Sequence, residues 1–264
     1  MLYNVNMRHG RFLFACFVMF VAGATAWCEE VDEAATTGDT LVEVVEDSPA
    51  YIVSIERLKV GDMKLDDTLE IMLDSFGRPL AGFELKFALE SPFINIDTVL
   101  PGEILDSCGW EFFNARAVNT QDKEGYPPVV WQAVGLAKTA PGGRGPTCYS
   151  LERQASIVRL VLSSWLVGRV PDTVVKIFFF WEDCSDNSIA NLSGDTLAIS
   201  ARVFDYFGNE LPQESNLFPN RTGATKQCID PDSRNKPRRQ IDFHNGGVEF
   251  KLDLGPVKED TTEK

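Results

Sequence analysis

Alternation of apolar and polar residues is the feature of this sequence that most restricts its fold. Between residues 80 and 90, the apolar side chains of Phe83, Leu85, Phe87 and Leu89 lie two positions apart. This spacing is the period of a β-strand with one buried face. A second, shorter apolar run at 94–99 leads into a Pro-Gly turn. The pattern predicts strands for this stretch.

Similar runs recur from residue 51 to about residue 211, separated by turns rich in Gly, Pro and Asp. The expected strands are 51–60, 68–74, 83–89, 94–99, 110–118, 129–137, 155–165, 173–181 and 196–204. In the first of these the apolar positions change parity, so a bulge is expected near Glu56. No segment has the period of a long amphipathic helix. Eight or nine strands predict an all-β fold, a two-sheet antiparallel sandwich spanning residues 50–211.

The first 26 residues have the features of a secretory signal peptide. Arg8 and Arg11 precede an apolar run from Phe12 to Ala22, and small residues suit cleavage after Ala26. A membrane anchor is the alternative, but the run is shorter than the roughly 20 residues that cross a bilayer. We therefore expect a secreted protein, extracellular or at the cell surface, with no membrane insertion after cleavage.

The distribution of charged residues distinguishes the segments before and after the predicted sandwich. The chain has a formal net charge of −14, which disfavours nucleic acid as a partner because both would be negative. Residues 27–49 contain eight acidic residues and no Lys or Arg, so we expect a disordered acidic linker. Residues 212–264 are interpreted as a charged C-terminal tail that docks weakly or stays mobile.

Several segments within residues 51–205 carry a resemblance to a known family. They are Gly61-Asp62 before the strand at 68–73, the run 80–87, Ile96-Asp97-Thr98-Val99, and Gly102-Glu103-Ile104-Leu105. As a set they resemble cohesin domains, which are jelly-roll sandwiches similar in fold to some carbohydrate-binding modules. The resemblance implies a non-catalytic extracellular recognition module that binds a protein partner through a flat sheet face, as cohesins bind dockerins. The expected partner is a secreted or cell-surface protein.

Five cysteines remain after the signal peptide: Cys28, Cys108, Cys148, Cys184 and Cys228. Export to an oxidising compartment favours disulfides among the last four, for which three connectivities are possible. In a cohesin-like jelly roll, the strand after Cys108 would run antiparallel to the strand ending before Cys184. The resemblance thus implies a Cys108–Cys184 bridge, with Cys148–Cys228 as the second pair.

The sequence gives little support for catalysis, so we expect no enzyme. His244 is the only histidine after the signal peptide, and it is expected to be solvated in the tail. Glu182, Asp183 and Asp186 could supply a glycosidase carboxylate pair, but acidic residues after a strand are typical of turns. Oxygen ligands for Ca²⁺ could come from Asp183, Asp186, Asn187 and Asp195. Because their spacing matches no EF-hand loop, we expect Asx turns and no cofactor.

Binding of polysaccharide is the alternative function. Five aromatic residues on strands or in loops are candidate sugar platforms: Trp110, Trp131, Trp181, Tyr126 and Tyr149. Core packing is the competing interpretation, because large aromatics dominate sandwich interiors. An exposed aromatic row on one sheet face would favour carbohydrate binding, and a smooth mixed face would favour a protein partner. A carboxylate pair across a cleft would favour a hydrolase.

Overall fold

The computed structural model describes residues 48–60, 67–90, 94–137, 154–164, 173–192, 196–213, 217–229 and 237–250. The expected signal peptide, and the expected linker up to residue 47, lie outside these residues and stay predictions. The described strands are β1 (Tyr51–Ile55), β2 (Arg57–Val60), β3 (Asp67–Asp74), β4 (Gly82–Leu89), β5 (Ile94–Pro101), β6 (Phe112–Asn119), β7 (Val129–Leu136), β8 (Ala155–Ser164), β9 (Thr173–Phe179), β10 (Ser188–Ala190), β11 (Leu197–Phe204), β12 (Arg238–His244) and β13 (Gly246–Phe250). Between them lie one short helix, α1 (Glu103–Cys108), and one 3-10 turn, Lys226–Cys228. No helix among the described residues is long and apolar enough to span a membrane.

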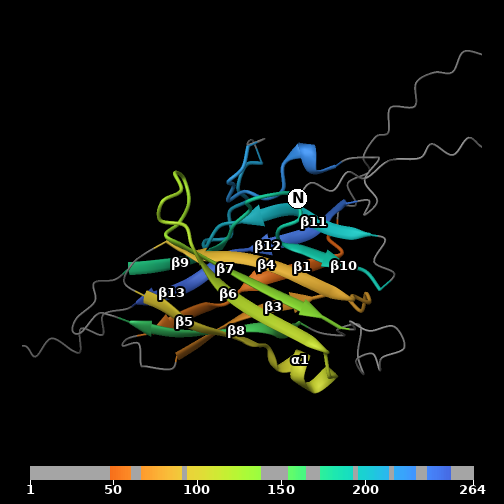
Figure 1. Ribbon diagram of the computed structural model, residues 1–264, viewed down its shortest axis with the longest axis horizontal. Coiled ribbons are helices and arrows are strands. Elements are labelled where there is room, and N and C mark those ends of the chain that lie inside the picture. Colours follow the sequence, from red (N-terminus) through yellow and green to blue (C-terminus); the bar gives the residue numbers. More distant parts are fainter. Residues whose placement is uncertain are drawn as a thin grey trace, which may run out of the picture. The chain divides into compact units, whose positions relative to one another are not determined.

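The strands form one hydrogen-bonded network, in which β7 and β6 branch from β4, and this network folds into two layers (Figure 1). One layer has the order β5-β8-β3-β1-β12-β11, and the other has the order β6-β7-β4-β9-β13-β2. The short strand β10 pairs with both β11 and β4 and so joins the layers. The expected all-β sandwich is therefore confirmed, but the described residues form thirteen strands where eight or nine were expected.

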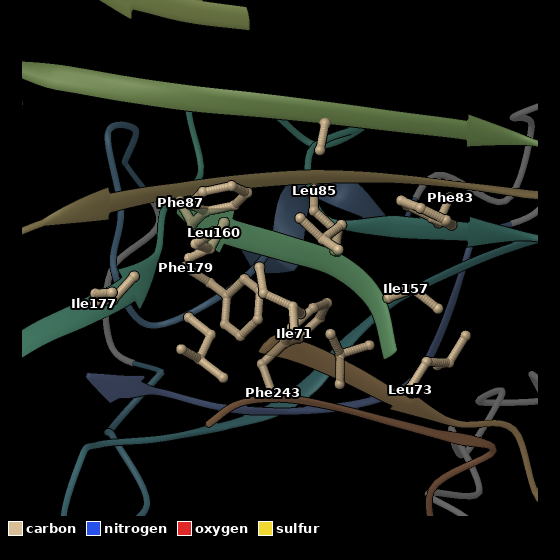
Figure 2. Packing of buried hydrophobic residues seen from close by; sticks show 14 of the residues in the cluster. Ile71, Leu73, Phe83, Leu85, Phe87, Ile157, Leu160, Ile177, Phe179 and Phe243 are labelled. Atoms are coloured by element: carbon tan, nitrogen blue, oxygen red, sulfur yellow. The ribbon is translucent and has the colours of Figure 1, made fainter. Parts of the chain in front are cut away.

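The core lies between the inner faces of the two layers. Leu69, Ile71 and Leu73 on β3 are completely buried, and Leu85 and Phe87 on β4 are equally buried on the other side. Figure 2 shows side chains of β3 and β4 converging on the same interior. Burying each of these side chains contributes about 1.5–3 kcal/mol. The alternation that predicted these strands is therefore the alternation that builds the core.

In the first expected strand, 51–60, the apolar positions change parity because the chain passes from one layer of the sandwich to the other. β1 pairs with β3 and β12, whereas β2 pairs with β13 in the other layer. Glu56 stands between the two strands, and its backbone groups bond to both sides: its N–H donates to Glu70 and its carbonyl accepts from Gly247. A break between two strands thus takes the place of the expected bulge.

The C-terminal segment corrects the expected domain boundary. β12 and β13 belong to the sandwich, and Ile241, Phe243, Val248 and Phe250 are at most 1% exposed. β12 lies between β1 and β11 and is parallel to both, while β13 is parallel to β2. The remaining strand pairs are antiparallel. The sandwich therefore continues past residue 211 to Phe250, and the interpretation of this segment as a weakly docked tail is wrong.

Charged residues concealed the alternation of β12. The guanidinium of Arg239 donates hydrogen bonds to the carbonyls of Ser200 and Ala224 and to the side chain of Gln213. Asp242 is buried and forms an ion pair with Arg202. Because the fold supplies partners for these groups, a segment that looks solvated in sequence can occupy an interior strand.

Candidate functional site

The outer surface of β6, β7 and β4 is the candidate site, and we call it the open face. Alternation sends Phe113 and Ala115 of β6 toward the core and leaves their neighbours outside. The outward residues are Phe112, Asn114, Arg116 and Val118 on β6, Gln132, Val134 and Leu136 on β7, and Glu84 and Lys86 on β4. A shallow depression of about 200 Å³ lies among the β6 and β7 residues.

Apolar side chains are exposed at both ends of the open face. Phe112 is directly opposite Leu136 in the ladder, and their exposed fractions are 40% and 37%. At the other end of β6, Val118 is 36% exposed. Large apolar groups that remain accessible on a flat sheet can serve as anchors for a macromolecular partner.

A row of polar side chains crosses the middle of the open face. Arg116 donates from Nε and Nη2 to Gln132 Oε1, at 3.0 and 2.8 Å. Gln132 donates in turn from Nε2 to Glu84 Oε1 at 2.6 Å. Partial burial raises the pKa of Glu84, against the hydrogen bond from Gln132 that lowers it. These bonds fix the orientation of one side chain from each of three neighbouring strands.

A charged cluster borders the row on the β9 side. The ammonium of Lys86 lies 2.7 Å from Asp186 Oδ1 and 3.2 Å from Glu182 Oε2. Glu182 also binds Lys123 at 2.7 Å, and the hydrogen bond from Lys123 is the main cause that lowers the pKa of Glu182. Burial raises the pKa of Asp186, opposed by Lys86 and by the backbone N–H groups of Glu182 and Asp183. The cluster pairs its charges internally.

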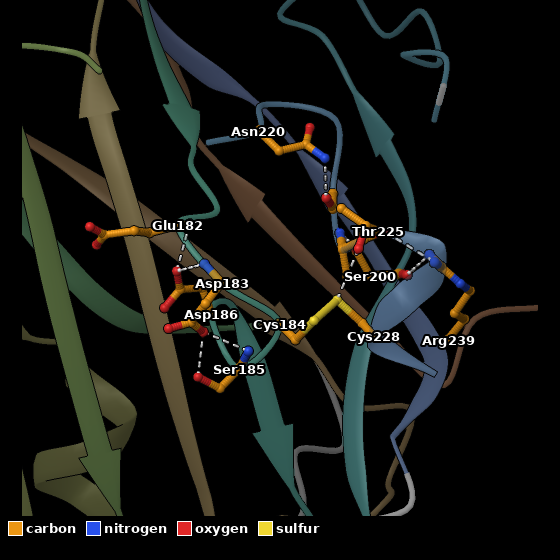
Figure 3. Close-up of a disulfide and its surroundings, with 12 residues drawn as sticks. Glu182, Asp183, Cys184, Ser185, Asp186, Ser200, Asn220, Thr225, Cys228 and Arg239 are labelled. Carbon is orange, nitrogen blue, oxygen red and sulfur yellow. Dashed lines mark hydrogen bonds between the residues drawn. A yellow bond between two sulfur atoms is a disulfide. The ribbon is translucent and has the colours of Figure 1, made fainter. Parts of the chain in front are cut away.

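The loop after β9 is held in place by buried side chains. Asn187 has a positive φ of 53°, a conformation that asparagine tolerates better than most residues. Its Oδ1 accepts from the Lys86 N–H at 2.7 Å, and its Nδ2 donates to the Phe180 carbonyl at 2.8 Å. Asp186 Oδ2 accepts from the N–H groups of Glu182 and Asp183 (Figure 3). These bonds give the charged cluster a defined position beside the open face.

A disulfide secures the same loop. Cys184 is bonded to Cys228, with a Cα–Cα distance of 5.1 Å (Figure 3). The implied Cys108–Cys184 and Cys148–Cys228 pairs are therefore wrong. Cys108 is also disulfide-bonded, and Cys148 lies outside the described residues. The implied pairing failed because the segment 217–229 folds back against the loop after β9, where the Trp181 and Asn220 backbones form a bridge.

The candidate aromatic residues occupy separate places. Trp181 is completely buried and contacts Phe243 edge-on, with ring centroids 5.3 Å apart. Trp110 is half-buried against Phe83. Tyr126 covers Phe180 and donates to Glu182 at 3.4 Å. Trp131 is half-buried and points to the inner side of β7, lining a cavity described below, while Tyr149 lies outside the described residues. The four described aromatics form no shared row.

The acidic candidate residues Asp183 and Asp186 form hydrogen bonds within the loop after β9. Asp183 accepts from the N–H and hydroxyl of Ser185, and the oxygens of Asp186 face an ammonium and backbone N–H groups. These side chains and Asn187 therefore make turn-type bonds, whereas Asp195 lies outside the described residues. Glu182 and Asp186 share Lys86 and flank no cleft that the structure describes. Glu182 and Asp186 are therefore members of an ion-pair cluster that stabilises the loop.

His244 is placed differently from the expectation. It lies on β12, is half-buried, and stacks on Phe204 with centroids 4.4 Å apart and planes 9° from parallel. Burial lowers its pKa, with smaller contributions from Arg57 and Arg202 and an opposing one from Asp242. The interpretation of His244 as a solvated tail residue is therefore wrong, because β12 is a strand of the sandwich.

The residues of the open face itself were not singled out from the sequence. Only the alternation of Phe112, Asn114, Arg116 and Val118 could have indicated them. That pattern does not indicate which face of the strand packs against the core and which face is exposed. This depends on the order of strands in the layer.

Comparison with solved structures matches this chain to cohesin modules, the family it was expected to resemble. One match is a type I cohesin–dockerin complex from Clostridium thermocellum, with 12% identity and a TM-score of 0.41 over 76% of this chain and 99% of that chain. Another is the sixth cohesin of scaffoldin B from Acetivibrio cellulolyticus, in complex with a dockerin, with 8% identity and a TM-score of 0.43 over 76% and 99%. A type III cohesin from a cell-surface anchoring scaffoldin of Ruminococcus flavefaciens has 10% identity and a TM-score of 0.42 over 77% and 88%.

At these identities the comparison concerns the fold alone. No protein-family model matches the chain, and no curated protein matches it.

Proposed function

We propose that this chain is a secreted, non-catalytic recognition module that binds a protein partner through the open face. The observation that carries the proposal is the composition of that face. Exposed apolar groups at its ends flank a polar row whose side chains are already oriented by hydrogen bonds. Protein interfaces combine a few apolar anchors with polar groups of fixed geometry in this way.

The same surface supports the two other functions less well. A polysaccharide platform on a sheet face needs exposed aromatic rings in a row, and Phe112 is the one aromatic residue of the open face as defined here. A hydrolase needs a carboxylate pair beside a cleft, whereas Glu182 and Asp186 are both paired with Lys86. A mixed face of moderate polarity is the pattern expected for a protein partner.

The experiment is a capture assay with a charge-reversal variant. The immobilised protein is challenged with the secreted and envelope fractions of the producing cell, with and without Ca²⁺. Arg116→Glu changes the centre of the open face, and Lys59→Glu is the matched control. Lys59 is an exposed cation on β2, at the opposite edge of the same layer.

We expect wild type and Lys59→Glu to capture the same protein, and we expect Arg116→Glu not to capture it. Capture of polysaccharide with no stoichiometric protein would overturn it. Capture of a protein that binds Arg116→Glu as well as wild type would exclude the open face as its site.

A further inference from the structure

A cavity of about 630 Å³ opens between the two layers where β5 approaches β6 and β7. Its volume lies within the range of small-molecule sites, roughly 300–1,000 Å³. Apolar walls come from Leu89, Ile94, Ile96, Ala117, Pro128, Val129 and Trp131, and polar groups come from Glu90, Asn95 and Gln121. The cavity is on the inner side of β6 and β7 and is therefore separate from the open face.

Trp131 is the largest side chain in the wall. Neighbouring residues on β7 point to opposite sides, so Gln132 belongs to the open face and Trp131 to the cavity. Ala117 is directly opposite Trp131 in the ladder between β6 and β7 and also lines the cavity. A small residue across from an indole leaves one ring surface uncovered by its neighbour on the edge strand.

The polar groups of the cavity favour an uncharged ligand. Gln121 contributes a carboxamide, which both donates and accepts hydrogen bonds without carrying charge. The side chain of Asn95 alternates with the buried Ile94 and Ile96 and donates to Asp97 instead. The carboxylate of Glu90 is within ion-pair distance of two cations, at 3.6 Å from Lys176 Nζ and 3.5 Å from Arg221 Nη1. An anionic ligand would meet a strongly acidic protein with no unpaired cation in the cavity lining.

We propose that this cavity binds a short neutral carbohydrate, with one pyranose ring stacked on Trp131 and its hydroxyl groups bonded to Gln121. A pyranose presents C–H groups on one face and hydroxyl groups around its rim, so it matches an indole beside a carboxamide. A purely apolar ligand would instead remove this carboxamide from water without replacing its hydrogen bonds, which is unfavourable. This site is independent of the protein partner proposed above.

The test uses saturation-transfer NMR on the protein with three neutral probes: cellotriose, xylotriose and mannotriose. Ala117→Trp would fill the cavity beside Trp131, and Val118→Trp adds the same bulk one residue away on the open face. Both positions are exposed, so both variants should fold. We expect transfer to at least one trisaccharide in wild type and in Val118→Trp, and its loss in Ala117→Trp.

A second readout is the indole N–H resonance of Trp131, assigned by its disappearance in Trp131→Phe. Binding should shift this resonance more than those of the other tryptophans. The proposal is overturned if none of the three sugars gives transfer, if Ala117→Trp binds as well as wild type, or if an uncharged apolar probe such as toluene shifts Trp131 while the sugars do not. Loss of the protein partner with Val118→Trp, while sugar binding persists, would show that the two sites are separate.

Discussion

Cys184 is disulfide-bonded to Cys228, which lies 44 residues further along the chain. The bond joins the loop that carries the charged cluster to the segment that precedes β12. It therefore links the border of the open face to the C-terminal strands of the sandwich.

The first prediction concerns this bond. Cys228→Ser should lower the free energy of unfolding by about 4 kcal/mol, because the unfolded chain regains the entropy of a loop of that length. Denaturant unfolding of wild type and variant measures the change. A non-reducing peptide map should contain a Cys184–Cys228 peptide, and a Cys108–Cys184 peptide would contradict the structure.

The second prediction tests whether β12 belongs to the core. Phe243→Ala should destabilise the protein by about 3–5 kcal/mol, because this ring is fully buried and contacts Phe179 and Trp181. Phe207→Ala is the matched control, since Phe207 is 64% exposed, and its effect should be within about 0.5 kcal/mol. If Phe243→Ala and Phe207→Ala changed the free energy of unfolding equally in thermal or denaturant unfolding, β12 would not be part of the core.

The third prediction concerns the loop after β9. Asn187→Ala should cost about 3 kcal/mol or more, because it leaves the Lys86 N–H and the Phe180 carbonyl without their partners and places alanine at positive φ. Asn187→Asp keeps the acceptor and should fall between wild type and alanine. Asn114→Ala on the exposed side of β6 should have little effect on unfolding. A change at Asn187 no larger than the one at Asn114 would refute this role.

The fourth prediction concerns pH. The pKa of Glu182 is lowered below its usual 4.5 by the hydrogen bond from Lys123 and then by Lys86. A lowered folded-state pKa gives stability that is present above the unfolded pKa and is lost as the pH falls through the folded value. Wild type should therefore have a higher Tm than Glu182→Gln at neutral pH, and the two should converge in acid. A difference in Tm that stays constant across this range would contradict the ion-pair assignment.

Local alternation was sufficient to predict the central strands of both layers. Leu69, Ile71 and Leu73, and likewise Phe83, Leu85 and Phe87, repeat at two-residue spacing and are buried in the structure. A strand with one buried face leaves this signature in its own sequence, so no knowledge of its neighbours is required.

The strands and contacts that were missed depend on distant partners. β12 contains arginine and aspartate that become acceptable in an interior strand only through Arg202, Ser200 and Ala224. The disulfide pairing follows from the return of residues 217–229 toward Trp181, which no local pattern records. The open face was missed for a similar reason, because exposure of Phe112 and Leu136 is set by the position of β6 at the edge of its layer.

The central claim is that the open face binds the protein partner, and affinity of that partner for two leucine variants tests it most directly. Leu136 on the open face and Leu100 on β5 have nearly equal exposed fractions, 37% and 39%, so replacing either by aspartate changes a similar amount of accessible apolar surface. With the partner identified by capture, we expect Leu136→Asp to weaken binding at least about tenfold, equivalent to about 1.4 kcal/mol, and Leu100→Asp to bind as wild type does. Undiminished binding by Leu136→Asp, or equal weakening by both variants, would contradict the account.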